Sequence, residues 1–396
     1  MTIDDDGGRV LQLASARLAK ALCLHGGLGM TKEQGWVSSR YSLEDARDSL
    51  ELVRKASDDI EAAAPAYQEW QCQRSPAGAA IAILAREAET GRPIGQVATI
   101  PIRVRLSSRV RLASLLPNPV IDPTYQDPGV LASLLGDICA LSAEEGITFT
   151  YGFPSQVPYL TALNGAGFRN IGAVPLLITP LNPGRLAMKT THSRVLAETA
   201  SIARRVWRTP ALAPQQKAVP GLEIEEVKSF DRSFAFFWDR IQNRYPIMVV
   251  RDPAYLNWRF VNMPTREYTT FAARSEGEIR GFTVLRVAPL GQFSAGLIVD
   301  LIVEASAEGR AAGRLLIDQA YSYLRDRDVD ILASLALRHT DEFRLLRSRG
   351  FWVCPKFLEP RPYRLVVRCH DEERSPSRLA YDLRNWFVTM GDYDAA

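Results

Sequence analysis

The segment Gln126-Asp127-Pro128-Gly129-Val130-Leu131 places a proline and a glycine where an apolar helical pattern begins. Backbone N–H groups at the start of a helix have no partner within the helix, and the helix dipole makes this end positive. A turn that keeps these groups open can bind an anion such as a phosphate. The same residues also suit a plain tight turn. The segment thus predicts either an anion site or a turn without a ligand.

Two carboxylates lie in an apolar stretch of the second half of the chain. Asp300 and Glu304 are four residues apart within the segment 295–304. Side chains of a strand alternate between its faces, so both acids are expected on the same face. A charged aspartate among isoleucine, valine and leucine is costly to bury without a partner. We expect either a cleft in which the acids act on a ligand or a fixed salt bridge.

The composition excludes several classes of protein. Hydrophobic residues form 46% of the 396 residues and charged residues 23%, as in a soluble globular protein, and the net charge of +3 is too small to indicate nucleic-acid binding. No run of about 18 apolar residues occurs, so no membrane span is expected. The five cysteines and four histidines are scattered, which predicts neither disulfides nor a metal site. Three aspartates in MTIDDDGGRV argue against a secretory signal and predict a cytoplasmic protein.

Strand and helix patterns follow the same order in both halves. In the first half, strands are predicted at 80–87, 93–104 and 110–121, a helix at 130–146, a strand at 147–153 and a helix at 157–168. In the second half, strands are predicted at 268–276, 279–287 and 295–304, a helix at 311–327, a strand at 329–337 and a helix at 340–351. This order predicts an α/β (α+β) fold with two mixed, mostly antiparallel sheets flanked by helices.

Two sequence patterns occur once in each half. PAYQEWQCQRSP (65–76) and PAYLNWRFVNMP (253–264) share P-A-Y-x-x-W-x-x-x-x-x-P at a separation of 188 residues (253 − 65). A Gly-Phe pair ends an apolar helix at Gly167 and again at Gly350, a separation of 183 residues (350 − 167). Two anchors in the same order predict a duplication that gives two similar domains.

The domains are expected at 1–182 and 222–396. They are joined by a connection at 183–221 that begins as a helix and ends rich in proline. Its basic residues would either contact an anionic surface or belong to a solvated helix. Trp70 and Trp258, at matching points of the repeat, would either flank a ligand or belong to the core.

The order of elements in each half resembles that of the GNAT family of acyl-CoA N-acyltransferases, present here in tandem. The family's most specific segment is a turn of the form (Arg/Gln)-x-x-Gly-x-(Gly/Ala) that follows a strand and opens a helix. Residues 126–131 match its first two positions and have Leu131 at the third. Residues 308–313 match it only at Gly313, whereas a register two residues later places Arg310 and Gly313 on the first two positions. The resemblance covers the chain from Pro65 to Val367.

The resemblance implies acetyl-CoA or another acyl-CoA as co-substrate, and no metal. The pyrophosphate would lie on the turn, which implies Gln126, Asp127, Pro128, Gly129, Val130 and Leu131 as binding residues, with Arg310 and Gly313 in the second half. The pantetheine arm would lie where the strand that ends at Val120 and Ile121 parts from the strand 147–153. We expect the first half to hold the cofactor because its turn matches the family better.

Acyl transfer to an amine requires an uncharged nitrogen, and an alkyl amine has a pKa of about 10. We therefore expect a carboxylate or a water chain that removes the proton, and a donor for the departing thiolate. The family's usual donor, a tyrosine four residues before the Gly-Phe pair, is replaced by Leu163 and Leu346. The remaining candidates, each of which also suits an ordinary packing or capping role, are Asp300, Glu304, Tyr151, Ser155, Tyr159 and His339.

The function predicted first is transfer of an acyl group from acyl-CoA to an amine of a small metabolite or amino sugar. No nucleic-acid partner is expected. Two alternatives remain: an aminoacyl-tRNA-dependent peptidyl transferase of the tandem GNAT type, and a GNAT-fold binding module without catalysis. The two replaced tyrosines favour the binding module, whereas the glycine turn favours the enzyme. The acidic tail 386–394 would either close over a cationic acceptor or be disordered.

Overall fold

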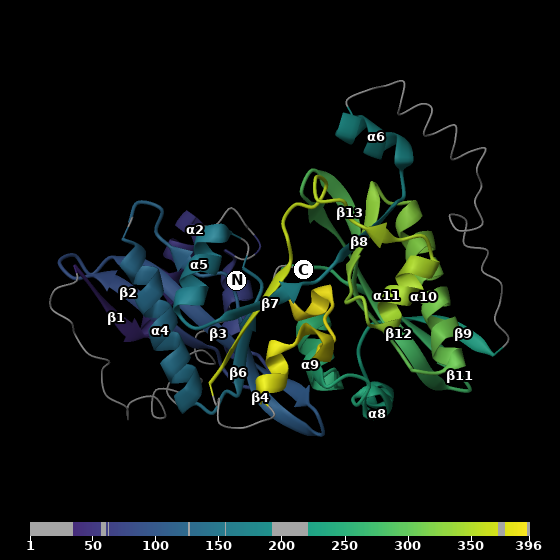
Figure 1. The fold of residues 1–396 in the computed structure, drawn as a ribbon, viewed down its shortest axis with the longest axis horizontal. Helices are drawn as coiled ribbons and strands as arrows, with labels where there is room; N and C mark the ends of the chain where they lie inside the picture. Colours follow the sequence, from purple (N-terminus) through teal and green to yellow (C-terminus); the bar gives the residue numbers. More distant parts are fainter. Residues whose placement is uncertain are drawn as a thin grey trace, which may run out of the picture.

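The computed structural model describes residues 35–56, 61, 63–125, 127–154, 156–191, 221–370 and 377–393. The described chain forms two lobes, each built on a β-sheet, and its C-terminal segment lies between them (Figure 1). This mixed α/β architecture with helices against both sheets confirms the predicted fold class. Within the described ranges, no helix is long and apolar enough to cross a membrane.

The first lobe contains the sheet β1-β2-β3-β4-β6-β16-β7, and β5 and β10 also pair with β3. Its strands are β1 Trp36–Arg40, β2 Ile81–Glu87, β3 Pro93–Leu106, β4 Arg109–Leu116, β5 Val120–Ile121, β6 Phe149–Gly152, β7 Arg169–Ala173, β10 Ile247–Val249 and β16 Arg364–Cys369. Its helices are η1 Leu43–Asp45, α2 Ala46–Ala56, α3 Pro65–Gln73, α4 Pro128–Glu144 and α5 Val157–Gly165.

The second lobe contains the sheet β15-β8-β14-β13-β12-β11-β9. Its strands are β8 Leu176–Pro180, β9 Leu222–Val227, β11 Thr269–Ser275, β12 Glu278–Leu290, β13 Phe293–Val303, β14 Ile331–Leu335 and β15 Trp352–Val353. The remaining helices are α6 Pro183–Thr191, α8 Arg232–Ile241, α9 Pro253–Leu256, the π-helical turn η2 Asn257–Val261, α10 Ala307–Arg325, α11 Asp341–Ser348, and the short 3-10 helices η3 Ser377–Tyr381, η4 Leu383–Asn385 and η5 Met390–Asp392.

The two lobes exchange strands. β8 comes from the first half of the chain but lies between β14 and β15 in the second sheet. β16 comes from the second half but lies between β6 and β7 in the first sheet. Strand pairing therefore crosses the domain limits expected from the sequence, and the limits 1–182, 183–221 and 222–396 stay a prediction.

Three apolar clusters hold the elements together. Val130, Leu134 and Ile138 of α4 are spaced by one helical turn and are buried in the outer core of the first lobe. On α10, Leu316, Ala320 and Leu324 have the same spacing and form part of the outer core of the second lobe. A larger central core joins the inner faces of both sheets, so the two lobes form one packed unit.

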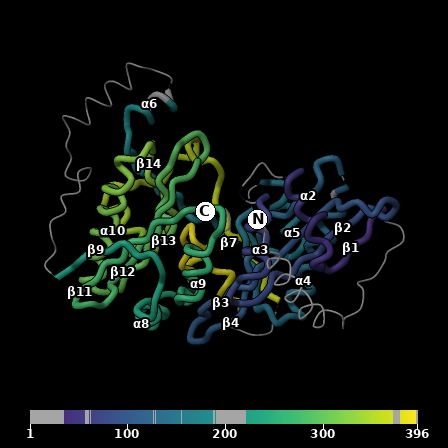
Figure 2. The backbone as a smooth tube through the Cα atoms, turned by 180° about the vertical axis from the view of Figure 1, so that it is seen from behind, coloured from purple at the N-terminus to yellow at the C-terminus, as the bar shows by residue number. Residues whose placement is uncertain are grey.

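The repeated tryptophans meet in this central core. The rings of Trp70 and Trp258 are stacked, with centroids 4.7 Å apart and planes at 13°. Each indole N–H donates to the main-chain carbonyl of the other residue, at 2.8 Å and 3.3 Å. α3 and α9, which begin the two repeats, lie side by side between the lobes when the molecule is seen from behind (Figure 2). The duplication seen in the sequence is thus also a pairing of the two copies in space.

Candidate functional site

The sheet parts in each lobe at the end of a parallel strand pair. In the first lobe, β4 and β6 pair from Ser114–Thr150 to Leu116–Gly152. The chain then continues into β5, which pairs with β3 instead. A Cβ at Gly152 would lie 2.9 Å from the Leu116 carbonyl oxygen, so glycine permits the close approach of the strands just before they part.

The second lobe repeats this arrangement. β13 and β14 pair in parallel from Ala295–Ile331 to Ile298–Ser334, and β13 then continues without β14 as far as Val303. A register shift between β12 and β13 accompanies the parting. Such a bulge bends the strand away from its neighbour. Both halves therefore have a gap between strands at the place where the resemblance predicts one.

Charged side chains fill the gap of the second lobe. The Glu342 carboxylate accepts from the Val303 N–H at 3.4 Å, and Arg244 donates both to the Val303 carbonyl and to Glu342, the latter at 2.7 Å. The Tyr245 hydroxyl donates to Glu342 at 3.2 Å. Residues 299–303 are buried. The N–H and carbonyl of Val303, at the end of this edge, are thus already bonded within the protein.

The gap of the first lobe is more open. Tyr159, which lies 183 residues before Glu342 (342 − 159), donates its hydroxyl to the Pro117 carbonyl at 3.3 Å. Asn118 is exposed, and Val120 and Ile121 are half-buried. Residues 117–121 are therefore partly or fully exposed, whereas residues 299–303 of the second lobe are buried.

Asp127 caps the helix that follows the first gap. Its carboxylate accepts from the Gly129 N–H at 2.7 Å, and its carbonyl accepts from the Val130 N–H at 3.3 Å. Pro128 begins the helix and has no N–H to offer. The donors expected to be open are thus bonded within the chain, and an anion would have to displace Asp127. Anion binding at this turn stays a prediction.

Two residues of the same predicted set remain. Gln126 lies outside the described residues. Leu131 is half-buried and packs against the outer core of the first lobe.

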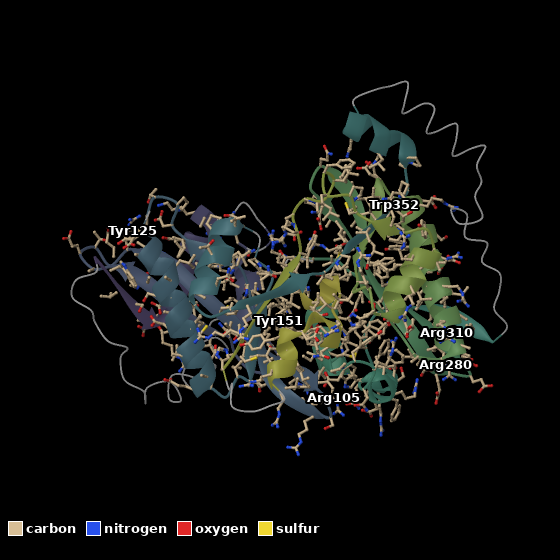
Figure 3. All side chains as sticks on the ribbon, viewed as in Figure 1. Arg105, Tyr125, Tyr151, Arg280, Arg310 and Trp352 are labelled. Carbon is tan, nitrogen blue, oxygen red and sulfur yellow. The ribbon has the colours of Figure 1, made fainter. Side chains whose placement is uncertain are left out.

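The equivalent helix start in the second lobe is built for packing. The Ser306 hydroxyl accepts from the Gly309 N–H at 2.9 Å, and a Cβ at Gly309 would lie 2.2 Å from the Glu304 carbonyl oxygen. A Cβ at Gly313 would lie 2.6 Å from Leu345, which explains the glycine by contact between helices α10 and α11. Arg310 is exposed on the outer side of the lobe, far from the centre of the molecule (Figure 3).

The two acids predicted on β13 are held by different arginines. Glu304 bonds to Arg240 at 2.6 Å and to Arg280 at 3.3 Å near the surface. Asp300 is buried and bonds to Arg251 at 3.1 Å. The structure does not bring Asp300 and Glu304 into one site, and both take part in the salt bridges that were the alternative interpretation.

Arg251 joins two buried carboxylates. Besides Asp300, it contacts Asp392 at 2.9 Å and the Thr389 hydroxyl at 3.2 Å. Burial raises the pKa of Asp300, although Arg251 acts in the opposite direction. One oxygen of Asp300 and one of Asp392 have no hydrogen-bond partner in the described part of the chain. An unbonded buried carboxylate oxygen is costly unless a ligand, proton or water satisfies it.

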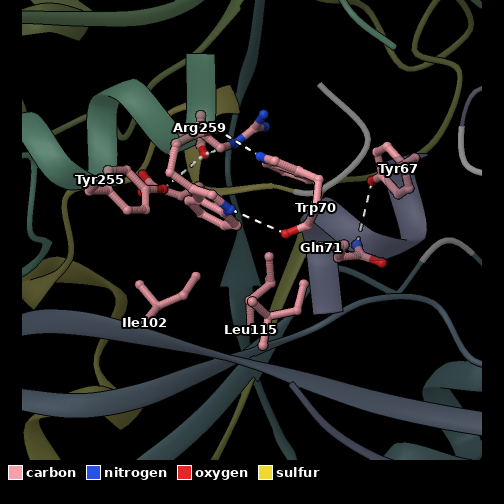
Figure 4. A pocket seen from close by; sticks show the side chains of 11 residues that line it. Tyr67, Trp70, Gln71, Ile102, Leu115, Tyr255 and Arg259 are labelled. Carbon is pink, nitrogen blue, oxygen red and sulfur yellow. Dashed lines mark hydrogen bonds between the residues drawn. The ribbon is translucent and has the colours of Figure 1, made fainter. Parts of the chain in front are cut away.

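A small cavity lies beside this cluster, between the two lobes. Its volume is about 10 Å³, enough for one water molecule. Aromatic and apolar side chains form most of the wall, together with Arg259 and Asp392 (Figure 4). The wall consists of Tyr67, Trp70, Gln71, Ile100, Ile102, Leu115, Tyr255, Trp258, Arg259, Gly391 and Asp392. Leu115 is the residue before Leu116, so the cavity lies on the inner side of the sheet where β4 and β6 part.

Tyr151 is near this cavity, and two of the other three predicted proton donors, Tyr159 and His339, do not line it. Tyr151 pairs with Leu115, lies between the lobes, and directs its hydroxyl to the Asp392 carbonyl at 3.5 Å (Figure 3). Burial, followed by the charge of Asp392, raises its pKa well above the usual value. Ser155 lies outside the described residues. His339 contacts the Trp386 carbonyl at 3.0 Å and so attaches the C-terminal segment.

Reasoning from the sequence missed Arg251 and Arg259 altogether, and named Asp392 only as part of an acidic tail. Arg251 lies two residues before the second copy of the repeat and Arg259 lies within it, which was the available signal. Among the described residues, no group of three side chains is arranged to hold a metal ion.

Comparison with known proteins identifies a family domain in the second half of the chain. Residues 233–352 match the family model described as acetyltransferase (GNAT) family. No curated protein matches the sequence significantly. The fold is similar to that of a probable N-acyltransferase from Enterococcus faecalis V583, with a TM-score of 0.58 and 15% identity over 84% of this chain and 72% of that chain.

Two further solved structures share the fold. One is a tandem GNAT protein from the clavulanic acid biosynthesis pathway, with a TM-score of 0.55 and 12% identity over 85% of this chain and 99% of that chain. The other is N-myristoyltransferase from Saccharomyces cerevisiae with bound myristoyl-CoA, with a TM-score of 0.57 and 12% identity over 86% of this chain and 80% of that chain. Residues 233–352 thus match the GNAT acetyltransferase family, and the two-lobed fold of the chain is similar to those of a tandem GNAT protein and of N-acyltransferases.

Proposed function

We propose that the protein is an N-acyltransferase that transfers an acyl group from acyl-CoA to a small amine. The observation that carries this proposal is the position of the cavity between the lobes. It adjoins Leu115, where the strands of the first lobe part, and its wall includes Asp392, which has an unbonded carboxylate oxygen. A thioester that enters through the strand gap and an amine that enters between the lobes would meet there, and the walls of this cavity of about 10 Å³ would have to move apart to admit them.

The first lobe is the proposed site for acyl-CoA. Its strand edge at Val120 and Ile121 is half-buried and accessible, whereas the edge at Val303 is bonded to Arg244 and Glu342. An extended pantetheine arm needs free main-chain groups along such an edge. The family model matches the second half of the chain, but the side chains of that half close its own gap. We therefore propose one molecule of acyl-CoA per chain.

Asp392 and Tyr151 are the proposed catalytic residues. In the reaction, the amine nitrogen bonds to the acyl carbon, the carbon–sulfur bond breaks, the nitrogen loses a proton and the thiolate takes one up. The unbonded oxygen of Asp392 can accept the proton from the amine. The raised pKa of Tyr151 keeps its hydroxyl protonated near neutral pH, so it can donate a hydrogen bond to the departing sulfur. Asp300 would support Asp392 through Arg251.

A binding module without catalysis is the second candidate. It is favoured by Asp127, whose carboxylate occupies the helix start where the pyrophosphate is expected. Release of free coenzyme A from acetyl-CoA, with amino sugars, polyamines and amino acids as acceptors, separates the two functions. The acyltransferase is expected to release thiol with at least one acceptor, and Asp392→Asn is expected to abolish this release. Binding of coenzyme A without thiol release for any acceptor would establish the binding module.

A further inference from the structure

Two buried arginines converge on one carboxylate beside the proposed acceptor site. Arg286 donates to both oxygens of Glu61, at 2.9 Å and 2.7 Å, and Arg266 donates to one of them at 3.1 Å. Arg266 and Arg286 are only 5% and 9% exposed, whereas the Glu61 side chain is 41% exposed. The cations are thus fixed inside the protein, and their anionic partner reaches them from the surface.

Arg266 connects this arginine pair to the cavity wall through Tyr67. The Arg266 guanidinium lies 5.1 Å from the centre of the Tyr67 ring, and Tyr67 forms part of the cavity wall. Arg259, another wall residue, donates to the Tyr268 hydroxyl at 3.1 Å. Burial alone would raise the pKa of Tyr268, but Arg259, Arg266 and Arg286 outweigh it and lower this pKa. The charges of Arg259, Arg266 and Arg286 therefore all act on Tyr268, which bonds to the wall residue Arg259.

We propose that Arg266 and Arg286 bind the carboxylate of the acceptor, and that the acceptor is an amino acid. This inference rests on the proposed acyl transfer at the same cavity. The amine of such an acceptor would face Asp392 and its carboxylate would face the two guanidinium groups. Arginine forms its strongest and most specific contacts with carboxylates through paired hydrogen bonds of this kind.

Glu61 holds the carboxylate position when no acceptor is present. A pair of buried guanidinium groups is costly without an anion, so the protein supplies one from its own chain. Because Glu61 is partly exposed, its carboxylate regains water when a ligand carboxylate replaces it, and the exchange costs little. An acceptor without a carboxylate would leave Glu61 in place and gain nothing from the arginines.

Calorimetry on the full chain tests this inference independently of catalysis. The twenty common amino acids and their carboxamides are titrated into the protein in the presence of coenzyme A. At least one amino acid is expected to bind about tenfold more tightly than its amide, the difference that one charged contact typically gives. Amino acids that all bind no more tightly than their amides, or that do not bind, would overturn the inference.

Glu61→Gln provides the sharper test because its site is partly exposed and the buried arginines stay in place. Removing the competing carboxylate should tighten amino-acid binding by about tenfold and leave amide binding unchanged. Glu278→Gln is the matched control, since Glu278 is an exposed acid paired with Arg280 at 3.5 Å on the far side of the second lobe. Weaker or unchanged amino-acid binding in Glu61→Gln would contradict the inference. Absence of thiol release with every amine would contradict the acyltransferase proposal alone, because the binding comparison does not depend on turnover.

Discussion

Replacement of Arg251 by methionine should strongly destabilise the protein at neutral pH. The side chains of Arg251, Asp300 and Asp392 are at most 2% exposed, so the substitution leaves two carboxylates buried without their cation. Breaking a buried ion pair in this way costs about 3–5 kcal/mol. Arg251 also bonds to Thr389 and thereby attaches the C-terminal segment to the second lobe. We therefore expect the loss of stability at the upper end of this range.

The destabilisation should depend on pH, with a sign that follows from Asp300. Burial already raises the pKa of Asp300, and removal of Arg251 should raise it further. An acid with a raised pKa in the folded state binds its proton more tightly there than in the unfolded chain. The variant is therefore relatively more stable at low pH, and it loses stability as the pH rises above the unfolded pKa of about 3.9. We expect a smaller loss at about pH 5 than at about pH 7.5.

Urea unfolding monitored by both tryptophan fluorescence and circular dichroism measures this effect. Agreement of the two signals is needed because a chain with two lobes need not unfold in one step. Arg251→Lys is the control, since it keeps the positive charge but loses the guanidinium group that bonds to both Asp300 and Asp392. It should lower the free energy of unfolding less than Arg251→Met does. A loss below about 1 kcal/mol, or an equal loss at both pH values, would refute the reasoning about a buried charge cluster.

Four other variants test three separate parts of the structure. Asp127→Ser keeps a helix cap but removes the carboxylate from the expected pyrophosphate position. Calorimetry should therefore show about threefold tighter binding of coenzyme A. Weaker binding would exclude this turn as the pyrophosphate site. Trp70→Ala and Trp258→Ala should each lower the free energy of unfolding in urea by about 3–5 kcal/mol. A double-mutant cycle should give a coupling energy of about 1 kcal/mol between the stacked rings. Losses that add up without coupling would contradict a stabilising contact between the two rings. Asp392→Asn should lower the rate of thiol release by at least about 100-fold without weakening coenzyme A binding, whereas an unchanged rate would exclude Asp392 as the base.

The sequence was sufficient for the local structure and for the duplication. Apolar spacing located α4 and α10 within a few residues, because each helix buries one face against its own sheet. The repeated Pro-Ala-Tyr and tryptophan positions identified the two copies, and the stacking of Trp70 on Trp258 shows why both copies keep a tryptophan.

The exchange of strands between the lobes could not be predicted in the same way. β8 and β16 are short apolar strands, and their side-chain pattern does not indicate which sheet they join. The cluster around Arg251 could not be predicted either, because its two acids, Asp300 and Asp392, are far from Arg251 in the sequence. Contacts between residues so far apart leave no periodic signal in the sequence.

Calorimetric titration of coenzyme A into the intact protein tests the central claim most directly, namely that the strand gap of the first lobe holds acyl-CoA. Gly129→Glu places a new carboxylate at the second residue of α4, and Ala311→Glu places one at the fifth residue of α10, the helix that follows the second strand gap. The account predicts one coenzyme A per chain, binding that is lost in Gly129→Glu, and binding that is retained in Ala311→Glu. Two molecules per chain, or loss of binding in Ala311→Glu alone, would contradict it.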